Sequence, residues 1–276
     1  MTLPAELPDE LVAAVRDARR IEVFTGAGMS ADSGLDTFRD AITGLWSRVD
    51  PQALASIDSW SRDPDPMWAW YLWRAAKARA AVPHEGHRAV AAWQDMPGVA
   101  VHVTTQNIDD LHERAGSRDV SHLHGSLFSF RCTLCGAPAP EPELPSLTGD
   151  PVARLRPPEC SICGNMVRPG VVWFGEALPQ ADFAAAEESM QTCDLVVIVG
   201  TSGVVYPAAG LPRIAASRGV PVVEVSPDDT ELTAVATWSL RTTAAGGGSA
   251  AADQLKRTSS RLSASSGGIW PFAMST

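Results

Sequence analysis

The sequence lacks any long run of apolar residues. Runs such as Leu195–Val199 are far shorter than the roughly 20 residues that a helix needs to cross a bilayer. Residues 1–20 contain prolines and acidic side chains where a secretion signal would have its apolar core. We therefore expect a protein of the cytoplasm with no membrane partner.

Basic side chains are also scarce. The chain has 22 Lys and Arg against 32 Asp and Glu, a formal charge of −10, and Lys77 and Lys256 are its two lysines. Affinity for nucleic acid comes mainly from neutralising phosphates with Lys and Arg. This balance argues against a nucleic-acid partner and suits a basic peptide better.

The cysteines are few but regularly spaced. Four of the five form two C-x-x-C pairs, and 24 residues, rich in proline, separate the pairs. Two such pairs can supply four thiolates to one tetrahedral Zn²⁺, which leaves no position for water and makes the metal structural. Disulfides are the weaker alternative in an intracellular protein. The predicted ligands are Cys132, Cys135, Cys160 and Cys163, and Cys193 is predicted to be a packed thiol.

With 276 residues and 45% apolar residues, the chain can form either one large core or a core plus a small module. Apolar strands alternate with helical patterns, which predicts an α/β fold with a doubly wound parallel sheet. The predicted strands are 21–24, 99–105, 194–199 and 221–227, and the predicted helices are 8–19, two within 51–81, 86–94, 111–115, 181–191 and 207–218. From Ala244 onward, Gly, Ser and Ala predict a mobile tail.

A glycine loop follows the first predicted strand. Gly26, Gly28 and Ala31 have the G-x-G-x-x-A spacing that lets backbone N–H groups approach a pyrophosphate. An ordinary turn has the same appearance, so this stretch alone leaves nucleotide binding open. Asp50 has about the spacing of the acidic residue that usually holds a ribose, but the segment before it is a poor strand, so we expect the ribose contact elsewhere.

Polar residues also follow two later strands. Gln106–Asp109 comes after one, and Gly200–Ser202 after another. Groups just past the carboxyl ends of parallel strands line the ligand crevice of such folds. Asn and Asp are equally common as loop and helix-capping residues, and a single histidine such as His124 is more often structural than catalytic.

The combination of motifs is far more specific than any one of them. In order and spacing, across about residues 10–244, the chain resembles the sirtuins, which are NAD-dependent protein-lysine deacylases. The motifs are GAGMSADSGLDTFRD at 26–40, TQNID at 105–109, HLHG at 122–125, the four cysteines, RPGVVWFGE at 168–176, VGTS at 199–202 and VVEVSP at 222–227.

The resemblance implies a domain organisation. We expect a Rossmann-like NAD-binding domain built from 1–40, 84–127 and 176–244, a helical insert at 41–83, a zinc-binding module at 128–175 and a flexible tail at 245–276. NAD and an acyl-lysine peptide would meet between the domain and the module. The products would be nicotinamide, O-acyl-ADP-ribose and free lysine, and we expect a monomer.

The resemblance also implies residue roles. His124 would be the catalytic base, with Asn107 and Asp109 positioning the nicotinamide ribose and carboxamide. NAD would contact Gly26, Ala27, Gly28, Phe38, Arg39, Gln106, Asn107, Ile108, Asp109, Gly200, Thr201, Ser202, Ser226 and Ala244. A substrate peptide would add as a strand along Val172, Phe174 and Gly175.

The acyl group is predicted from a pair of residues on one helix. Tyr71 and Arg74 are i and i+3, so they share a face, and a guanidinium with a phenol can hold a terminal carboxylate. The alternative is that both residues simply pack. The pair resembles the Y-x-x-R of class III sirtuins, and Ala55 matches the small residue that enlarges their acyl pocket. We therefore predict a desuccinylase and demalonylase that also deacetylates.

Two departures and two alternatives remain. Ser226 stands where the family usually has Asn, and after Arg241 the chain turns to Gly and Ser instead of a Leu-rich closing helix. The alternatives are a protein mono-ADP-ribosyltransferase and a non-catalytic NAD-responsive binding module. The intact Asn107, Asp109 and His124 argue against the second.

Overall fold

The computed structural model describes residues 7–35, 55–148 and 151–247. Its large unit is a six-stranded sheet in the order β3-β2-β1-β7-β8-β9, and every pairing is parallel. This is the strand order of a Rossmann sheet, in which the order reverses beside the first strand. The strands are β1 Arg20–Thr25, β2 Ala100–Thr105, β3 Val120–His122, β7 Leu195–Val199, β8 Val222–Val225 and β9 Trp238–Leu240. The predicted parallel sheet is confirmed.

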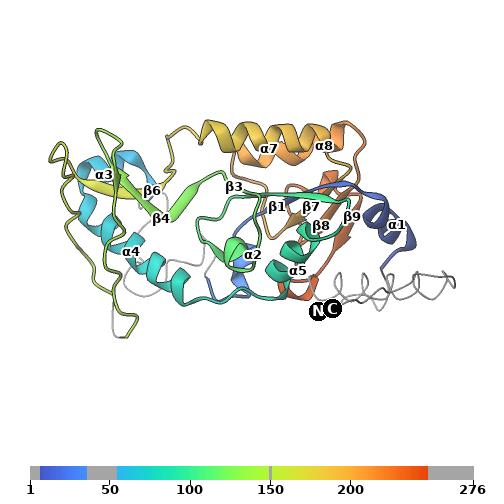
Figure 1. Ribbon diagram of the computed structural model, residues 1–276, viewed down its shortest axis with the longest axis horizontal. Coiled ribbons are helices and arrows are strands. Elements are labelled where there is room, and N and C mark those ends of the chain that lie inside the picture. The colour runs from blue at the N-terminus through green and yellow to red at the C-terminus, as the bar shows by residue number, and fades with distance from the viewer. Residues whose placement is uncertain (1–6, 36–54, 149–150, 248–276) are drawn as a thin grey trace, which may run out of the picture.

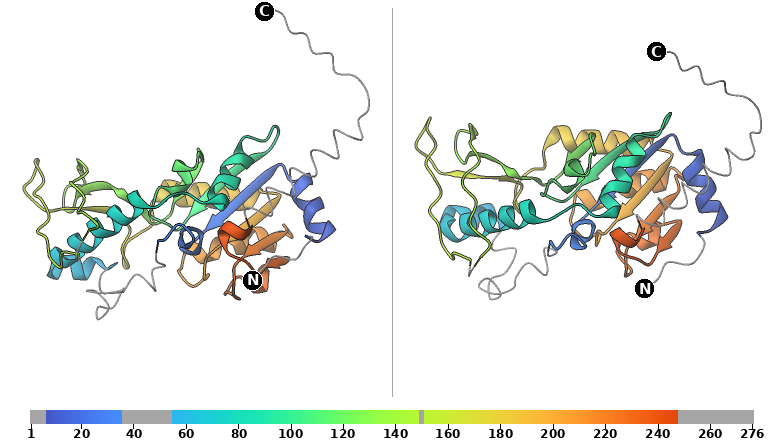
Figure 2. Two further views of the ribbon diagram at one scale, coloured as in Figure 1. Left: turned by 90° about the horizontal axis from the view of Figure 1, so that it is seen from below. Right: turned by 60° about the horizontal axis from the view of Figure 1, so that its bottom comes forward.

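Helices cover both faces of this sheet (Figures 1 and 2). On one face, α1 Asp9–Asp17 and α5 Glu85–Gln94 share a core with odd-numbered β1 residues such as Val23. On the other face, α7 Gln180–Thr192 and α8 Leu211–Ser217 pack near Phe24. Because both faces are covered, all five residues of β7 are buried, which explains its uninterrupted apolar sequence.

Short elements complete the large unit. They are α2 Gly28–Ala31, α6 Leu111–Arg114 and the 3-10 helices η3 Ala208–Gly210 and η4 Thr233–Val235. Residues 244–247 are helical, and the Ala245 N–H donates to Asp32 Oδ2 at 2.9 Å. Ala244, the expected last residue of the domain, is buried in the sheet core, and the helical turn includes the first three residues of the expected tail. Residues 248–276 lie outside the described part.

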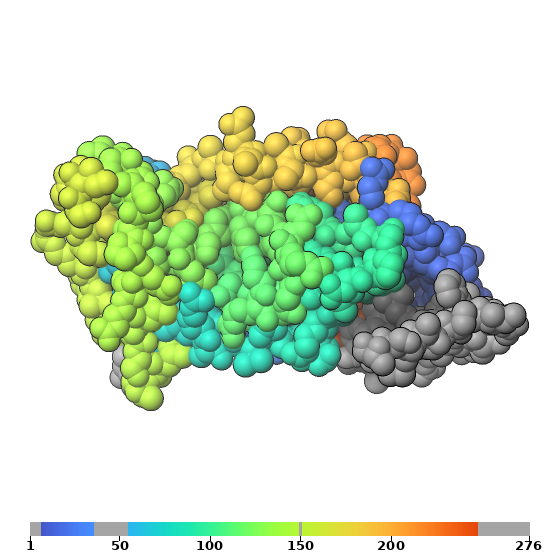
Figure 3. Space-filling model, viewed as in Figure 1, coloured from blue at the N-terminus to red at the C-terminus, as the bar shows by residue number. Residues whose placement is uncertain are grey.

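The second unit lies at the other end of the elongated molecule (Figure 1). It contains the antiparallel sheet β5-β4-β6 and two helices. Their bounds are β4 Gly125–Cys132, β5 Pro138–Ala139, β6 Val167–Val171, α3 Ile57–Arg62 and α4 Pro64–Ala80. In the space-filling view the yellow-green segments of this unit cap that end (Figure 3). The helices and the cysteine-bearing segment share one core, which includes Trp68, Tyr71, Phe130 and Trp173.

Local sequence explains the two helices. Ser56 caps α3 by accepting the Ser59 N–H at 3.2 Å. Pro64 is the first residue of α4, Asp65 follows in its first turn, and Lys77 lies in its last turn, so charges and proline match the helix polarity. Among the described residues, no helix combines the length and the apolar character needed to span a membrane.

Candidate functional site

A cavity of about 1430 Å³ lies between the two units. Its walls come from the loops after β1, β2, β7 and β8 on one side and from α4 and the segment after β6 on the other. The carboxyl ends of neighbouring parallel strands therefore face the space where a ligand binds in this kind of sheet.

Two glycine loops form the floor of the cavity. The Gly28 N–H donates to the Gly200 carbonyl at 2.8 Å, so the loops after β1 and β7 touch through their backbones. A Cβ added to Gly28 would lie 2.8 Å from the Gly200 Cα, and Gly200 itself has φ +60°. Larger residues would force these loops apart. The cavity floor is consequently bare backbone, which suits phosphate groups.

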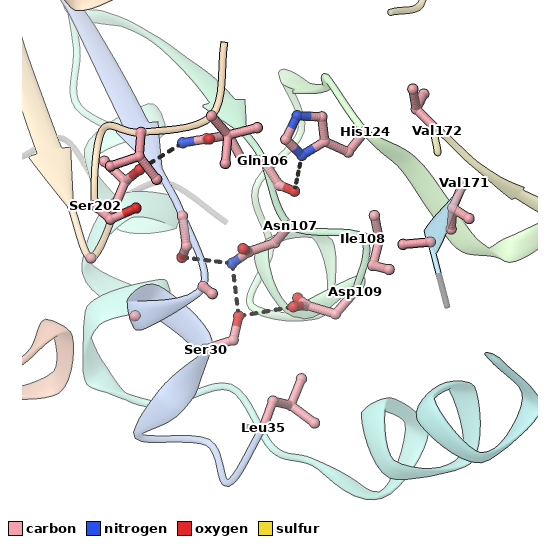
Figure 4. Close-up of a pocket in the computed structure, with 18 of the residues that line it drawn as sticks. Ser30, Leu35, Gln106, Asn107, Ile108, Asp109, His124, Val171, Val172 and Ser202 are labelled. Atoms are coloured by element: carbon pink, nitrogen blue, oxygen red, sulfur yellow. Dashed lines mark hydrogen bonds between the residues drawn. The ribbon is translucent and has the colours of Figure 1, made fainter. Parts of the chain in front are cut away.

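Asn107 and Asp109 form a buried network with Ser30 (Figure 4). The Asn107 amide donates to the Gly26 carbonyl and to Ser30 Oγ, both at 3.0 Å. Ser30 in turn donates to Asp109 Oδ2 at 2.9 Å. This network ties the loop after β2 to the glycine loop after β1. Sequence reasoning gave no role to Ser30, whose position in the glycine motif was the available signal.

The carboxyl group of Asp109 has a perturbed pKa. Burial raises this pKa, and hydrogen bonds from the Leu111 N–H and the Ser30 hydroxyl offset the rise in part. A carboxylate held in a cavity wall with little water is well placed to stabilise positive charge that develops nearby.

His124 lies beside this network with one fixed tautomer (Figure 4). Its Nδ1 donates to the Gln106 carbonyl at 2.9 Å, so Nε2 carries the lone pair. Burial lowers the His124 pKa, and the hydrogen bond to Gln106 opposes this in part. The Gln106 amide donates to Thr201 Oγ1 at 2.8 Å, which links the loops after β2 and β7. The imidazole is therefore a neutral base at the cavity wall.

Tyr71 and Arg74 both line the α4 side of the cavity, as does Ala55. The Arg74 guanidinium carbon lies 4.7 Å from the Trp70 ring and 5.8 Å from the Tyr71 ring. Burial raises the pKa of Tyr71 to about 12, so its hydroxyl keeps its proton and can donate. The predicted pair thus presents a cation and a donor to one cavity wall.

The segment after β6 forms the wall opposite the glycine loops. Val172, Phe174 and Gly175 line the cavity, and Phe174 is 43% exposed. The N–H groups of Val172 and Phe174 already donate to the carbonyls of His124 at 2.8 Å and Ala55 at 2.7 Å. A peptide strand at this edge must use other backbone groups of the segment.

A buried ion pair holds this segment in place. Arg168 donates to both carboxylate oxygens of Glu176, at 2.5 and 2.8 Å, and its guanidinium carbon lies 3.4 Å from the Trp173 ring. Glu176 also accepts the Trp173 backbone N–H at 2.8 Å. Sequence reasoning quoted these residues within one motif but assigned them no role, because their pairing across a turn has no periodic signature.

The four paired cysteines converge at the far end of the second unit. Their sulfur atoms all lie within 4.8 Å of one another, with Cys132 and Cys163 at 3.4 Å and Cys135 and Cys160 at 3.8 Å, and none forms a disulfide. Four thiolates that each lie about 2.3 Å from one tetrahedral zinc ion would be about 3.8 Å apart. The cluster therefore fits one structural Zn²⁺, as predicted. Cys193 is a separate buried thiol.

Of the three remaining predicted NAD-contacting residues, two lie outside the described part of the chain and one lies within it. Phe38 and Arg39 lie outside the described residues, as does Asp50. Ala244 belongs to the same buried sheet core as Val225 and does not line the cavity, because it begins the helical turn 244–247. The other predicted NAD-contacting and substrate-contacting residues all line it.

Comparisons with known proteins agree with this arrangement. The model of the Sir2 family matches residues 26–207. A Corynebacterium efficiens protein named NAD-dependent protein deacylase 2 is 63% identical over 238 residues, covering 86% of this chain and 92% of the relative. The crystal structure of a Sir2 homolog–NAD complex matches with a TM-score of 0.81 and 39% identity, covering 95% of this chain and 98% of the other.

A more distant structure, described as Sir2-p53 peptide-NAD+, matches with a TM-score of 0.74 and 27% identity over 92% of this chain and 99% of the other. The family model covers well over half of the chain, and the relatives are matched over most of their length. This chain belongs to the Sir2 family.

Proposed function

We propose that the protein is an NAD-dependent protein-lysine deacylase that prefers succinyl- and malonyl-lysine and also removes acetyl groups. The observation that carries the proposal is a neutral imidazole, a buried Asn and Asp pair and two bare glycine loops around one cavity. The named activity of the Corynebacterium relative and the NAD complex of the homologue support it.

The cavity floor fits NAD. At Gly26, Gly28 and Gly200 an added Cβ would lie under 3.0 Å from backbone atoms of the facing loop, so only glycine lets the two loops touch. Glycine loops of this kind after parallel strands commonly hold a pyrophosphate. We assign Gly26–Gly28 and Gly200–Ser202 to the phosphates and riboses, and Ser226 to the adenosine side. Bound NAD would supply the ribose carbon that releases nicotinamide and takes up the acyl oxygen, and one water would be consumed in forming O-acyl-ADP-ribose and free lysine.

The roles of the polar residues follow from their bonding. Asn107 and Asp109, both 8% exposed, would fix the nicotinamide end, with Gln106 and Ile108 completing that wall. Asp109 would stabilise the positive charge that develops on the ribose. His124 would take a proton from a ribose hydroxyl through Nε2, since its Nδ1 is already a donor to Gln106.

We assign the binding of the acylated peptide to α4 and the segment after β6. Arg74 and the Tyr71 hydroxyl would bind the terminal carboxylate of the acyl group, and Ala55 would leave room for it. The peptide would lie along Val172, Phe174 and Gly175.

The test compares kcat/KM on succinyl-lysine and acetyl-lysine versions of one peptide. For Arg74→Met we expect the succinyl-to-acetyl ratio to fall by about 10- to 100-fold, because a charge-assisted hydrogen bond is lost. Arg62→Met, at an exposed position of α3 outside the cavity wall, is the matched control. An unchanged ratio in Arg74→Met would refute the acyl preference. Labelled ADP-ribose appearing on the protein substrate would instead favour ADP-ribosyl transfer.

Three further assignments remain predictions from the sequence alone: a cytoplasmic location, a monomeric state and the absence of a nucleic-acid partner. Mass photometry of the purified protein tests the second, since a dominant species at twice the 29.2 kDa chain mass would contradict it.

A further inference from the structure

The segment H-L-H-G carries a second histidine, His122, which is the last residue of β3. Its Nδ1 lies 3.0 Å from the Asn107 carbonyl oxygen, and its Nε2 lies 2.7 Å from Glu113 Oε1 in α6. The side chain is 19% exposed and does not line the cavity. The imidazole therefore bridges α6 and the loop after β2 from behind the cavity wall.

The two partners of His122 determine how many protons its ring carries. A backbone carbonyl and an ionised carboxylate both accept hydrogen bonds and donate none. A neutral imidazole has one N–H and one lone pair, so it would direct that lone pair at one of the two oxygens. Both contacts are hydrogen bonds when both ring nitrogens are protonated. The geometry thus selects the imidazolium ion, with an acceptor at each nitrogen.

The pKa directions of the two side chains agree with this geometry. Burial lowers the pKa of His122, but the hydrogen bond and the charge of Glu113 outweigh it, so the pKa is raised above its usual value. Burial raises the pKa of Glu113, but the hydrogen bond from His122 outweighs it, so that pKa is lowered. Each partner therefore favours the charged form of the other.

The other histidine of the segment is held in the opposite state. His124 donates from Nδ1 to the Gln106 carbonyl at 2.9 Å, and its Nε2 has no acceptor among the described residues. Burial lowers its pKa. Leu123, which separates the two histidines, is fully buried and anchors the backbone between them. One short segment thus presents a neutral base to the cavity and a cation behind its wall.

A cation at this position acts on both polar residues of the cavity wall. It holds the backbone carbonyl of Asn107, whose side-chain amide donates to the Gly26 carbonyl and to Ser30. It also favours the carboxylate form of Asp109, because its positive charge lowers a pKa that burial raises. The charge on His122 therefore supports both the position of the wall and its negative charge.

The groups around His122 supply acids but no second cation. The titratable side chains that face it from each neighbouring element are Glu113 and His112 of α6, Asp109 of the loop after β2 and His124 of its own segment. Burial lowers the pKa of His112 to about 4, so that ring is neutral. Among the described residues of this group, His122 is the one that carries positive charge.

We propose that His122 is a positioning residue that serves as a fixed cation behind the cavity wall, keeping Asn107 and the carboxylate of Asp109 in the arrangement that releases nicotinamide. The inference rests on the proposed deacylase function and deepens it. When His122 loses its second proton as pH rises, its ring no longer donates to both oxygens, and its charge near Asp109 disappears. Turnover should then fall although His124 is still a neutral base.

The chain offers a test variant and a matched control. Glu113→Gln keeps the size of the side chain and an acceptor oxygen but removes the charge that keeps His122 protonated. Glu113 is 42% exposed and outside the cavity wall. Glu85→Gln in α5 removes an exposed carboxylate that pairs with Arg88 at 2.6 Å, also outside the cavity wall. Both variants change the net charge equally, but only the first removes the partner of His122.

The first experiment needs no turnover. Zinc-loaded wild-type protein with ¹⁵N-labelled histidine rings is titrated with pH in the absence of NAD. The resonances assigned to His122 should show loss of the second ring proton with a midpoint above 6.5, and those of His124 a midpoint below 6.5. Glu113→Gln should lower the His122 midpoint, and Glu85→Gln should leave it in place. A wild-type His122 midpoint at or below 6.5 overturns the inference.

The second experiment measures kcat/KM for NAD against pH at saturating acyl-lysine peptide, followed by nicotinamide release. The wild type should show a falling limb with a midpoint above 6.5. In Glu113→Gln this limb should move to lower pH by on the order of 1 pH unit, the low end of the effect of a close opposite charge, because Glu113 is partly exposed. Glu85→Gln should keep the wild-type profile.

A purely structural role for Glu113 and His122 would give a different result. Loss of packing lowers kcat/KM by the same factor at every pH and leaves the midpoints unchanged. Activity of Glu113→Gln that approaches the wild-type value on the acid side of the limb supports the proposal, since His122 is protonated there in both proteins. A falling limb that stays at the wild-type pH in Glu113→Gln overturns it.

Failure of the inference and failure of the proposed function can be told apart. If the wild-type protein releases no nicotinamide with any acyl-lysine peptide, the proposed function is wrong and the inference fails with it. If the wild type turns over and either the His122 midpoint or the falling limb contradicts the expectation, the function stands and the role of His122 is wrong.

Discussion

Removing Glu176 from the Arg168–Glu176 pair should destabilise the protein more than removing both partners. The Arg168 side chain is 2% exposed, whereas that of Glu176 is 19% exposed. Glu176→Ala leaves a guanidinium buried with two backbone carbonyls, those of Pro169 and Val171, as its remaining acceptors. We expect this change to lower the free energy of unfolding by about 3–5 kcal/mol, the usual cost of a stranded buried charge.

Replacing Arg168 instead of Glu176 should lower the free energy of unfolding by less. Arg168→Met leaves the carboxylate of Glu176 within reach of water, and the Met side chain keeps part of the contact with Trp173. We expect a loss of about 1–3 kcal/mol. In the double variant no charge is stranded, so it should be more stable than Glu176→Ala alone by about 1–3 kcal/mol.

The assay is urea unfolding of the zinc-loaded protein at neutral pH, followed by tryptophan fluorescence and compared through midpoints at a common slope. Burial raises the Glu176 pKa, but hydrogen bonds from Arg168 and the Trp173 backbone outweigh it, so the folded pKa is lowered. The pair's contribution is therefore present above the unfolded pKa of about 4.3 and lost as pH falls through the folded value. If the double variant is no more stable than Glu176→Ala, the reasoning about stranded charge is wrong.

Three further predictions concern protonation and metal. Burial lowers the pKa of His87 to about 2 and that of His112 to about 4, so both stay neutral when folded while the unfolded chain takes up protons below about 6.5. The contribution of these two histidines to the free energy of unfolding should be fully present above that pH. Below it, the free energy of unfolding should fall by up to about 1.4 kcal/mol per pH unit per group, and His87→Leu should flatten this slope in acid unfolding curves. For His124, the lowered pKa predicts that the rising limb of kcat/KM against pH has its midpoint below 6.5, and a midpoint above 7 would rule out this base. The variant His124→Tyr should abolish turnover in a protein that still unfolds cooperatively. Cys160→Ser should lower zinc content, measured by inductively coupled plasma mass spectrometry, and unfold the second unit, while Cys193→Ser should retain one zinc per chain.

The large sheet was predictable because its strands carry the signal of burial on both faces. The run from Leu195 to Val199 has no polar interruption, and each predicted strand is followed by glycine or polar residues at the edge where ligands bind. The strand β9 was not predicted, since three residues at a partly exposed edge have too little apolar pattern. Length and burial together decide how visible a strand is in a sequence.

Some residues of the candidate site were likewise predictable from the sequence, and others were not. The cysteine spacing and the polar residues after strands are local patterns, so the zinc cluster and the Asn107 to Asp109 wall followed from the sequence. The roles of Ser30, Arg168 and Glu176 did not, because each depends on a partner brought near by the fold. The helical turn 244–247 was not predicted, since small residues can pack in a core as well as form a flexible segment.

The strand β4 begins at Gly125, directly after His124, and ends at Cys132. One strand therefore connects His124, the proposed base, to a cysteine of the cluster, although Gly125 has φ +73° and the pairing register shifts between Ser126 and Phe130. A displacement at the cysteine end is passed along this strand to the loop that holds the imidazole. We expect metal-depleted protein to lose catalytic alignment while the parallel sheet is still intact, so that metal supply sets the active fraction of the enzyme.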